Sequence, residues 1–249
     1  MGAVSFDLFE TLIRVDRSAL PTVTWPGGSM PSTVPLLLAA LTARGHSVSP
    51  VSLLTELIRA EQAADRECVG DLRERPAALM FERAVRGLGC ARGNGDAAAL
   101  GEVLADEHMR AVAAASTTEP GARSTLAELR ARGFKLALVS NLDHARAKAW
   151  LLARTRLDGM FDAVVVSAEV GVRKPHGRIF TRALDALGLE PEAVLHVGDN
   201  PVTDVEGASA AGMRTAHLTR AGAPTPRLPA DLVVGGLAEL PALVERPAA

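Results

Sequence analysis

The stretch Lys135–Ser140, with the sequence KLALVS, decides the fold class of this chain. It is a short apolar run that ends at a small polar residue, which is typical of a strand buried on both faces of a parallel sheet. Five other runs predict further strands: Ala3–Phe6, Ala163–Ser167, Ala193–Val197, Arg214–Leu218 and Asp231–Val234. We therefore expect a largely parallel β-sheet.

Segments with helical spacing separate these runs. Apolar residues recur at intervals of three and four in Arg123–Arg132, Ala145–Ala153 and Gly177–Leu187, and Leu237–Val244 predicts a closing helix. This alternation of strand and helix predicts an α/β fold with a doubly wound parallel sheet.

Residues 16–117 follow a different pattern, without a convincing β-branched run and with apolar residues repeating at three and four. Helices are predicted there at Val34–Ala43, Val51–Ala64, Ala77–Leu88 and Ala97–Ala114. We expect residues 1–15 and 118–249 to form the sheet domain, and residues 16–117 to form an inserted α-helical domain.

The composition favours a small-molecule partner. The 249 residues carry 27 basic and 29 acidic side chains, and aromatic residues make up 3% with no Tyr, so no nucleic-acid partner is expected. The apolar stretch Leu36–Leu41 is far shorter than the roughly 20 residues of a membrane-spanning helix, so no membrane partner is expected. Because Asp7 follows so soon after the first residue, we expect no signal peptide and a cytoplasmic protein. The sequence fits either a monomer or a homodimer.

Polar side chains stand at the carboxyl ends of the predicted strands, the edge where open α/β sheets bind ligands. They are Asp7 and Thr11 after the first strand, Ser140 and Asn141 after the second, Lys174 after the third, and Asp199 and Asp204 after the fourth. Taken singly, each fits an ordinary turn, loop charge or helix cap. Together they indicate a site for a small phosphorylated substrate, which we expect Thr11, Ser140, Asn141 and Lys174 to bind.

Each residue type has a use in phosphoryl transfer. Asp7 can act as a nucleophile that forms an acyl-phosphate. Asp7 and Asp199, with backbone carbonyls, offer the oxygen ligands that Mg²⁺ prefers. Lys174 and the Ser140 hydroxyl can hold the phosphoryl oxygens, and Lys174 also offsets the repulsion between carboxylates. Asp204 either reaches the metal through water or caps the helix that follows it.

Four ordered motifs in this chain resemble those of the haloacid dehalogenase (HAD) superfamily. They are Phe6–Leu12 (FDLFETL), Val139–Asn141 (VSN), Gly171–Pro175 (GVRKP), and Val197–Asn200 (VGDN) followed by Asp204. The resemblance covers residues 1–15 and 118 to about 220, and the inserted segment resembles the family's helical cap.

This resemblance implies a Rossmann-like core beneath a mobile lid, with Asp7 as the nucleophile and Asp199 as a metal ligand. Most members of the superfamily are Mg²⁺-dependent phosphatases of small metabolites. The motifs are specific for the superfamily but predict little about the substrate.

One position departs from the family pattern. Phosphatases of this family generally carry a second Asp two residues after the nucleophile, as general acid and then base, and here that position is Phe9. A missing general acid typically costs roughly 10²- to 10⁴-fold in rate. The resemblance implies that Phe9 still offers its backbone carbonyl to the metal, so the expected ligands are Asp7, Phe9, Asp199 and Asp204. Glu10 is the nearest replacement for the missing proton donor.

Three functions remain open at this point. The favoured one is a Mg²⁺-dependent phosphohydrolase that cleaves phosphoric monoesters through an aspartyl-phosphate on Asp7. The second is a 2-haloacid dehalogenase, because those relatives have an aromatic residue at the Phe9 position and need neither a proton nor a metal. The third is a catalytically weak protein that binds a phosphorylated ligand or a partner. The retained Asp199 and Asp204 favour the first, and His196 is expected to be a packed core histidine rather than a ligand.

Overall fold

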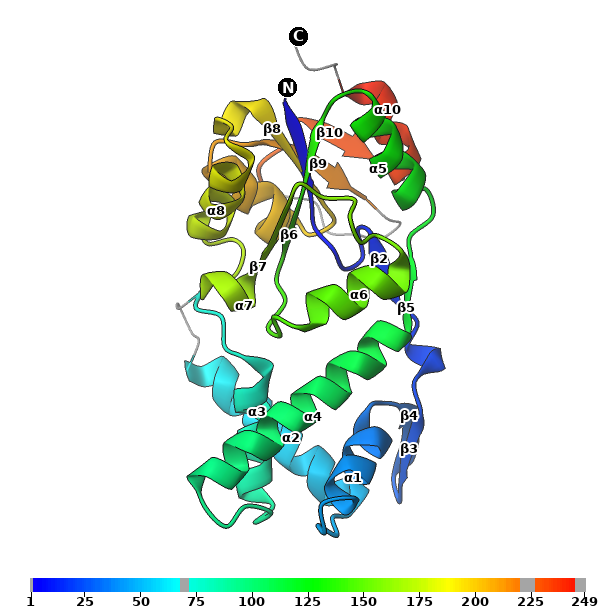
Figure 1. The fold of residues 1–249 in the computed structure, drawn as a ribbon, viewed down its shortest axis with the longest axis vertical. Coiled ribbons are helices and arrows are strands. Elements are labelled where there is room, and N and C mark those ends of the chain that lie inside the picture. The colour runs from blue at the N-terminus through cyan, green and yellow to red at the C-terminus, as the bar shows by residue number, and fades with distance from the viewer. Residues whose placement is uncertain (1, 68–71, 220–226, 245–249) are drawn as a thin grey trace.

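A computed structural model describes residues 2–67, 72–219 and 227–244 of the chain (Figure 1). Within these ranges six strands form one parallel sheet in the order β10-β9-β8-β1-β6-β7. Their bounds are β1 (Ala3–Phe6), β6 (Lys135–Ser140), β7 (Ala163–Val166), β8 (Val194–Gly198), β9 (Arg214–Leu218) and β10 (Leu232–Val234). The parallel sheet predicted from the apolar runs is confirmed.

The strand order reverses between β1 and β8. Numbered along the chain within this sheet, the strands follow the order 6-5-4-1-2-3, which is the Rossmann order. The doubly wound, Rossmann-like prediction is therefore confirmed. The carboxyl ends of β1 and β8 flank the point of reversal, where open α/β sheets bind their ligands.

Helices cover both faces of this sheet (Figure 1). One face carries α5 (Ala122–Ala131), α6 (Ala147–Thr155) and α10 (Leu240–Leu243), and the other carries α8 (Gly177–Leu187) and α9 (Gly207–Ala210); α7 (Ser167–Val170) follows β7. Short helical turns occur at Arg17–Ala19 (η1), Pro191–Ala193 (η2), Pro201–Glu206 (η3) and Leu237–Glu239 (η4). The predicted closing helix is thus the turn η4 followed by α10.

Period-two alternation along β6 explains why both faces are covered. Leu136 and Leu138 pack in the apolar cluster that contains α5, while Ala137 and Val139 pack in the cluster that contains α8. Successive side chains of a strand point to opposite faces, so a strand with no polar residue in its middle needs a covering layer on each side.

The inserted segment contains the four predicted helices and a hairpin that the sequence did not predict. The helices are α1 (Val34–Thr42), α2 (Pro50–Glu67), α3 (Ala77–Gly87) and α4 (Asn94–Ala114). The all-helical prediction was wrong for Thr22–Trp25 (β3) and Gly28–Pro31 (β4), which form an antiparallel hairpin. Only Val23 of this hairpin is buried, so it lacks the run of apolar residues that marked the other strands.

A second small antiparallel pair joins the two parts of the chain. Ile13–Val15 (β2) pairs with Ser116–Thr118 (β5), so the two places where the chain leaves and re-enters the sheet domain lie side by side. The helical part has its own apolar cluster, which runs from Val23 to Ala105 and includes Phe81. On these grounds we propose the division into residues 1–15 and 118–249 against residues 16–117.

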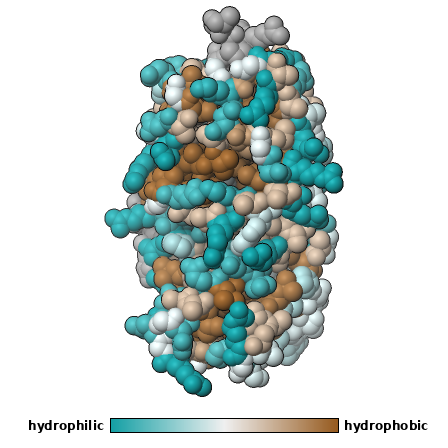
Figure 2. Space-filling view, in the orientation of Figure 1, coloured by the Kyte–Doolittle hydropathy of each residue, from teal (hydrophilic) through white to brown (hydrophobic). Residues whose placement is uncertain are grey.

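Among the described residues, no helix combines the length and the apolar character needed to cross a membrane. Hydrophilic residues cover much of the face in Figure 2, and hydrophobic residues gather in a band just above its middle.

Candidate active site

The candidate site lies at the carboxyl ends of β1, β6 and β8. Asp7 follows β1 directly, Ser140 ends β6, and Asp199 follows β8. The Asp7 backbone N–H donates to the Val197 carbonyl at 2.9 Å, which fixes the end of β1 against β8. Sheet pairing thus brings together residues that are almost 200 positions apart in the sequence.

Lys174 forms the centre of a buried ion-pair cluster. Its Nζ lies 2.5 Å from Asp7 Oδ1 and 2.6 Å from Asp204 Oδ1. The three side chains are 2%, 10% and 2% exposed, respectively. Charges removed from water to this extent interact strongly, so each carboxylate depends on the ammonium group.

Burial and charge shift the pKa values of this cluster in opposite directions. Burial raises the pKa of Asp7 to about 7, against the lowering effect of Lys174. Burial disfavours the charged forms of Asp204 and Lys174, but several attractive contacts together outweigh it. Lys174 and His196 lower the pKa of Asp204, and Asp204 and Asp7 raise the pKa of Lys174. Burial and the Asp204 charge raise the pKa of Asp199. The cluster therefore holds more negative charge than one lysine neutralises.

The arrangement fits a divalent cation. Asp7, Asp199 and Asp204 each offer a carboxylate oxygen, and these atoms lie within 4.8 Å of one another. Such hard anionic oxygens suit Mg²⁺, whose charge would balance the excess of carboxylates. The Phe9 side chain packs against the apolar cluster on the α5 face. The metal-ligand role of its carbonyl stays a prediction.

The Ser140 hydroxyl is a buried polar group that a ligand atom could pair with. Ser140 is 1% exposed, and among the described residues its Oγ has no hydrogen-bond partner. Buried hydroxyl groups are nearly always paired, so an unpaired one at the edge of a sheet indicates a missing ligand atom. A phosphoryl oxygen would supply that partner.

Comparison with known proteins gives the family. Residues 1–212 match the model of the haloacid dehalogenase-like hydrolases. This chain belongs to that family. The family's four motifs coincide with the residues that the fold gathers around Lys174.

Among curated relatives, this hydrolase is similar to two phosphatases. It is 44% identical over 124 residues to the phosphoserine phosphatase of Thermus thermophilus, which is 49% of each chain. It is 39% identical over 97 residues to the glyceraldehyde 3-phosphate phosphatase of Pyrococcus furiosus, which is 39% of this chain and 40% of that protein. The chain thus spans half or less of the length of these relatives.

Solved structures confirm the fold over nearly the whole chain. The 2-haloacid dehalogenase of Pseudomonas syringae matches with a TM-score of 0.68 at 23% identity, covering 98% of this chain and 97% of that one. At this level of identity, the likeness shows the fold alone.

Two predicted substrate-binding residues of this hydrolase bond to other site residues. Thr11 Oγ1 donates to Asp199 Oδ1 at 3.4 Å. Asn141 Nδ2 donates to the Lys174 carbonyl at 3.1 Å, and Asn141 Oδ1 accepts from the Lys174 N–H at 2.6 Å. Both side chains therefore hold the site together, and their contact with substrate stays a prediction.

The segment after β8 depends on a glycine. A Cβ at Gly198 would lie 2.3 Å from Asp204 Cγ, so only glycine lets Asp204 approach the strand end. Asn200, rather than Asp204, caps the turn η3, because its side chain accepts from the backbone N–H groups of Val202 and Thr203. Asp204 Oδ2 accepts from the Asn200 N–H at 3.0 Å, so Asp204 also contributes to the start of this turn, and its contact with a metal through water stays a prediction.

Sequence reasoning missed two histidines beside the site. His196 is buried as predicted, but its ring also bonds to Ser5 and Asp204. His217 Nε2 donates to the Asp199 carbonyl at 3.1 Å. A histidine inside a buried strand was the signal available for both.

A further missed feature is the segment Leu72–Ala77, here called the strap, which ties the helical part to the loops that hold Asp143 and Arg173. The Leu72 carbonyl accepts from the Arg173 N–H, the Glu74 N–H donates to the Gly171 carbonyl, and the Ala77 N–H donates to the Asp143 carbonyl, at 2.9 to 3.0 Å. No local pattern encodes these contacts, because they depend on how the two parts dock.

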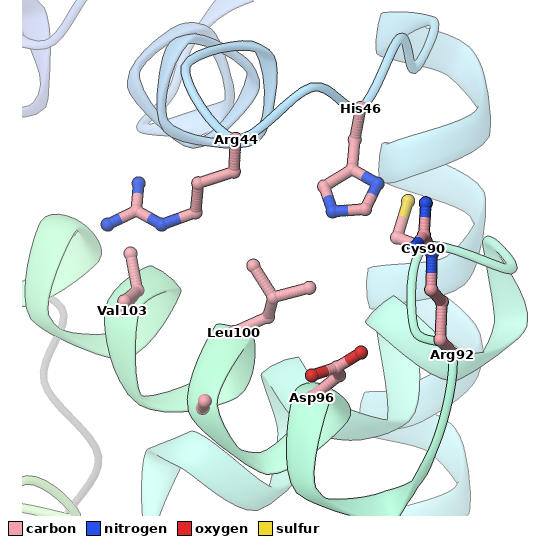
Figure 3. Close-up of a pocket in the computed structure, with 8 residues that line it drawn as sticks. Arg44, His46, Cys90, Arg92, Asp96, Leu100 and Val103 are labelled. Atoms are coloured by element: carbon pink, nitrogen blue, oxygen red, sulfur yellow. The ribbon is translucent and has the colours of Figure 1, made fainter.

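A pocket of about 400 Å³ lies in the helical part, and none of the candidate site residues lines it. Figure 3 shows the side chains that line this pocket. Arg44, His46 and Arg92 line it together with Asp96 and Cys90. Arg44 and Arg92 lie on the surface, and nothing links this pocket to the chemistry at β1 and β8.

Proposed function

We propose that this chain is a Mg²⁺-dependent phosphohydrolase that acts on a small phosphorylated metabolite through an aspartyl-phosphate on Asp7. The observation that carries the proposal is the charge balance of the buried cluster. Asp7 and Asp204 share one ammonium group, and Asp199 adds a third carboxylate whose oxygen lies within 4.8 Å of theirs, so a further cation fits the site, whereas halide displacement requires none. The names of the two curated phosphatases support the same reaction class.

The residues have distinct roles in the first half-reaction. An Asp7 oxygen attacks phosphorus, a bond from Asp7 to phosphorus forms, and the ester bond to the leaving alcohol breaks. Lys174 holds the Asp7 carboxylate in place. The Ser140 hydroxyl and Lys174 bind the phosphoryl oxygens. In the second half-reaction water attacks the same phosphorus, which releases inorganic phosphate and restores the Asp7 carboxylate.

The metal ligands are Asp7 and Asp199, with the Phe9 carbonyl. Asp204 acts through water, because its Oδ1 already accepts from Lys174 and His196 and its Oδ2 accepts from the Asn200 N–H at 3.0 Å. When bound, Mg²⁺ supplies charge neutralisation and orients the phosphoryl group.

The proton for the leaving alcohol does not come from Phe9. Glu10 is the first replacement to test, because its charge contributes to the raised pKa of Asp199 and so acts within range of the site. Its backbone adopts φ 57°, the left-handed region that a non-glycine residue adopts at some cost.

A pocket of about 220 Å³ receives the leaving group. Residues 73–77 of the strap line one side of it. Asp143 and Arg173 line the other side, and they belong to the loops that hold Asn141 and Lys174. Its charged lining has both signs: Arg73, Arg75, Arg83 and Arg173 with Glu61, Glu74 and Asp143. We infer that the leaving group is small and polar.

A 2-haloacid dehalogenase is the second candidate, because Phe9 leaves the site without the usual proton donor and halide departs without one. A catalytically weak binding protein is the third. The cytoplasmic location and the monomeric or homodimeric state stay predictions.

One screen separates these functions. Phosphate release is measured from a generic phosphate monoester, phosphoserine and glyceraldehyde 3-phosphate, with Mg²⁺ and with EDTA, beside halide release from 2-chloropropionate. We expect Mg²⁺-dependent phosphate release that is lost in Asp7→Asn. Halide release that persists in EDTA would support the dehalogenase instead, and ligand binding without turnover would support the third function.

A further inference from the structure

A buried serine–histidine pair lies on the sheet behind the ion-pair cluster. Ser5 of β1 and His196 of β8 are register partners, and both are no more than 1% exposed. Ser5 Oγ lies 2.9 Å from His196 Nδ1, and His196 Nε2 lies 3.4 Å from Asp204 Oδ1. Because Asp204 holds Lys174, the pair connects the middle of the sheet to the reacting end of the site.

The hydrogen-bonding partners determine where the proton of the imidazole lies. The Asp204 carboxylate pairs with Lys174 and can only accept, so His196 Nε2 must carry the hydrogen that faces it. A neutral imidazole then has an acceptor at Nδ1, to which the Ser5 hydroxyl donates.

Packing fixes the plane of the ring. The Phe180 ring of α8 meets the His196 ring edge-on, with centroids 5.3 Å apart and an interplanar angle of 82°. With Ser5 on one nitrogen and Phe180 against the ring, His196 has one orientation available for its bond to Asp204.

We propose that His196, held as the Nε2–H tautomer by Ser5, is a positioning residue that orients Asp204 and thereby Lys174. This inference rests on the proposed function, in which Lys174 holds Asp7 and the phosphoryl oxygens. Without the His196 bond, only Lys174 holds Asp204 Oδ1, while the Asn200 N–H still holds Oδ2, so Oδ1 and the Lys174 ammonium that it accepts from can shift together. Misplacement of a catalytic group by 1 Å costs roughly 10²-fold in rate, and loss of an outer hydrogen-bond partner costs roughly 10- to 100-fold.

Kinetics of matched variants test the role. We expect His196→Leu to lower kcat about 10- to 100-fold with little change in KM, because it removes the donor from a buried site. His196→Gln keeps an N–H donor of similar reach and should recover part of kcat. Ser5→Ala should have a kcat between that of His196→Leu and that of His196→Gln. The control is Thr125→Val on the opposite face, whose buried hydroxyl donates to the Leu237 carbonyl at 2.9 Å. It should keep kcat, although it too loses a buried hydrogen bond. An unchanged kcat in His196→Leu, or no recovery in His196→Gln, overturns the proposal.

Nitrogen NMR tests the same inference without turnover. In the wild-type protein we expect His196 as the Nε2–H tautomer, and we expect the Lys174 ammonium resonance to shift in His196→Leu and to return toward wild type in His196→Gln. A protonated Nδ1, or a Lys174 signal that ignores both variants, overturns the proposal. If these NMR results hold in a protein that cleaves no phosphate ester, the proposed function fails while the positioning of Lys174 stands.

Discussion

Replacing Asp7, the proposed nucleophile, with Asn should make the protein more stable. The folded chain buries Asp7, Asp204 and Lys174 together, so two carboxylates share one ammonium group while Asp199 adds a third negative charge nearby. Asp7→Asn removes the excess charge and keeps the shape of the side chain. Lys174 retains its ion pair with Asp204.

The pKa of Asp7 sets the upper limit of the effect. A rise from 3.8 to about 7 on folding corresponds to at most about 4 kcal/mol, at roughly 1.4 kcal/mol per pKa unit. This pKa already includes the attraction of Lys174. Because structural relaxation and water penetration reduce the cost of a buried charge, we expect a net gain of about 2 kcal/mol. For a chain of this size such a gain raises Tm by roughly 4 to 8 °C.

The sign of the pH dependence follows from linkage. Between pH 3.8 and about 7 the folded protein holds a proton on Asp7 that the unfolded chain has lost, so wild-type stability falls as pH rises through this window. The Asn side chain does not titrate, so the stability of Asp7→Asn does not fall in this window. The difference in unfolding free energy between Asp7→Asn and wild type should therefore be largest above about pH 7 and should vanish as the pH falls toward 4.

Thermal and urea denaturation in EDTA at pH 8 and pH 5 measure this difference. The matched variant is Asp204→Asn, which is also isosteric but removes the main partner of Lys174. Folding lowers the pKa of Asp204, so its carboxylate stabilises the folded state above about pH 4. The free energy of unfolding of Asp204→Asn should therefore be about 3 kcal/mol below that of wild type at pH 8. If Asp7→Asn is less stable than wild type at pH 8, or if its advantage does not depend on pH, the charge argument is wrong.

Three other substitutions test separate parts of the site and fold. Asp199→Asn should weaken Mg²⁺ binding at least about 10-fold by calorimetry, because a hard cation loses an anionic ligand; an unchanged affinity would remove Asp199 from the metal site. Phe9→Asp should raise kcat/KM for an alkyl phosphate relative to an aryl phosphate with a good leaving group, by up to roughly 10²-fold, and a constant ratio in a folded variant would place the proton donor elsewhere. Gly101→Ala should cost about 1 to 3 kcal/mol in urea denaturation, because its Cβ would lie 2.6 Å from the Ala78 carbonyl oxygen and 2.8 Å from the Glu82 nitrogen, whereas Gly95→Ala, with nothing within 4 Å, should cost nothing.

The sequence alone determined the sheet and its flanking helices. Lys135–Ser140 and Arg214–Leu218 are strands with the bounds that their apolar runs predicted, and Gly177–Leu187 is a helix with its predicted bounds. These elements follow from side-chain periodicity, which is a property of neighbours along the chain. The same local reasoning placed Asp7, Ser140 and Asp199 at the carboxyl ends of strands.

Tertiary structure decided what these side chains do. Asn141 and Thr11 bond to Lys174 and Asp199, the hairpin β3–β4 forms in a segment with little apolar signal, and His196 meets Ser5 from 191 positions away. A hydrogen-bond partner, a buried charge balance or a shifted pKa depends on groups that only the completed fold brings within a few ångströms. No periodicity within one segment carries that information, because each interaction depends on the relative placement of two or more segments.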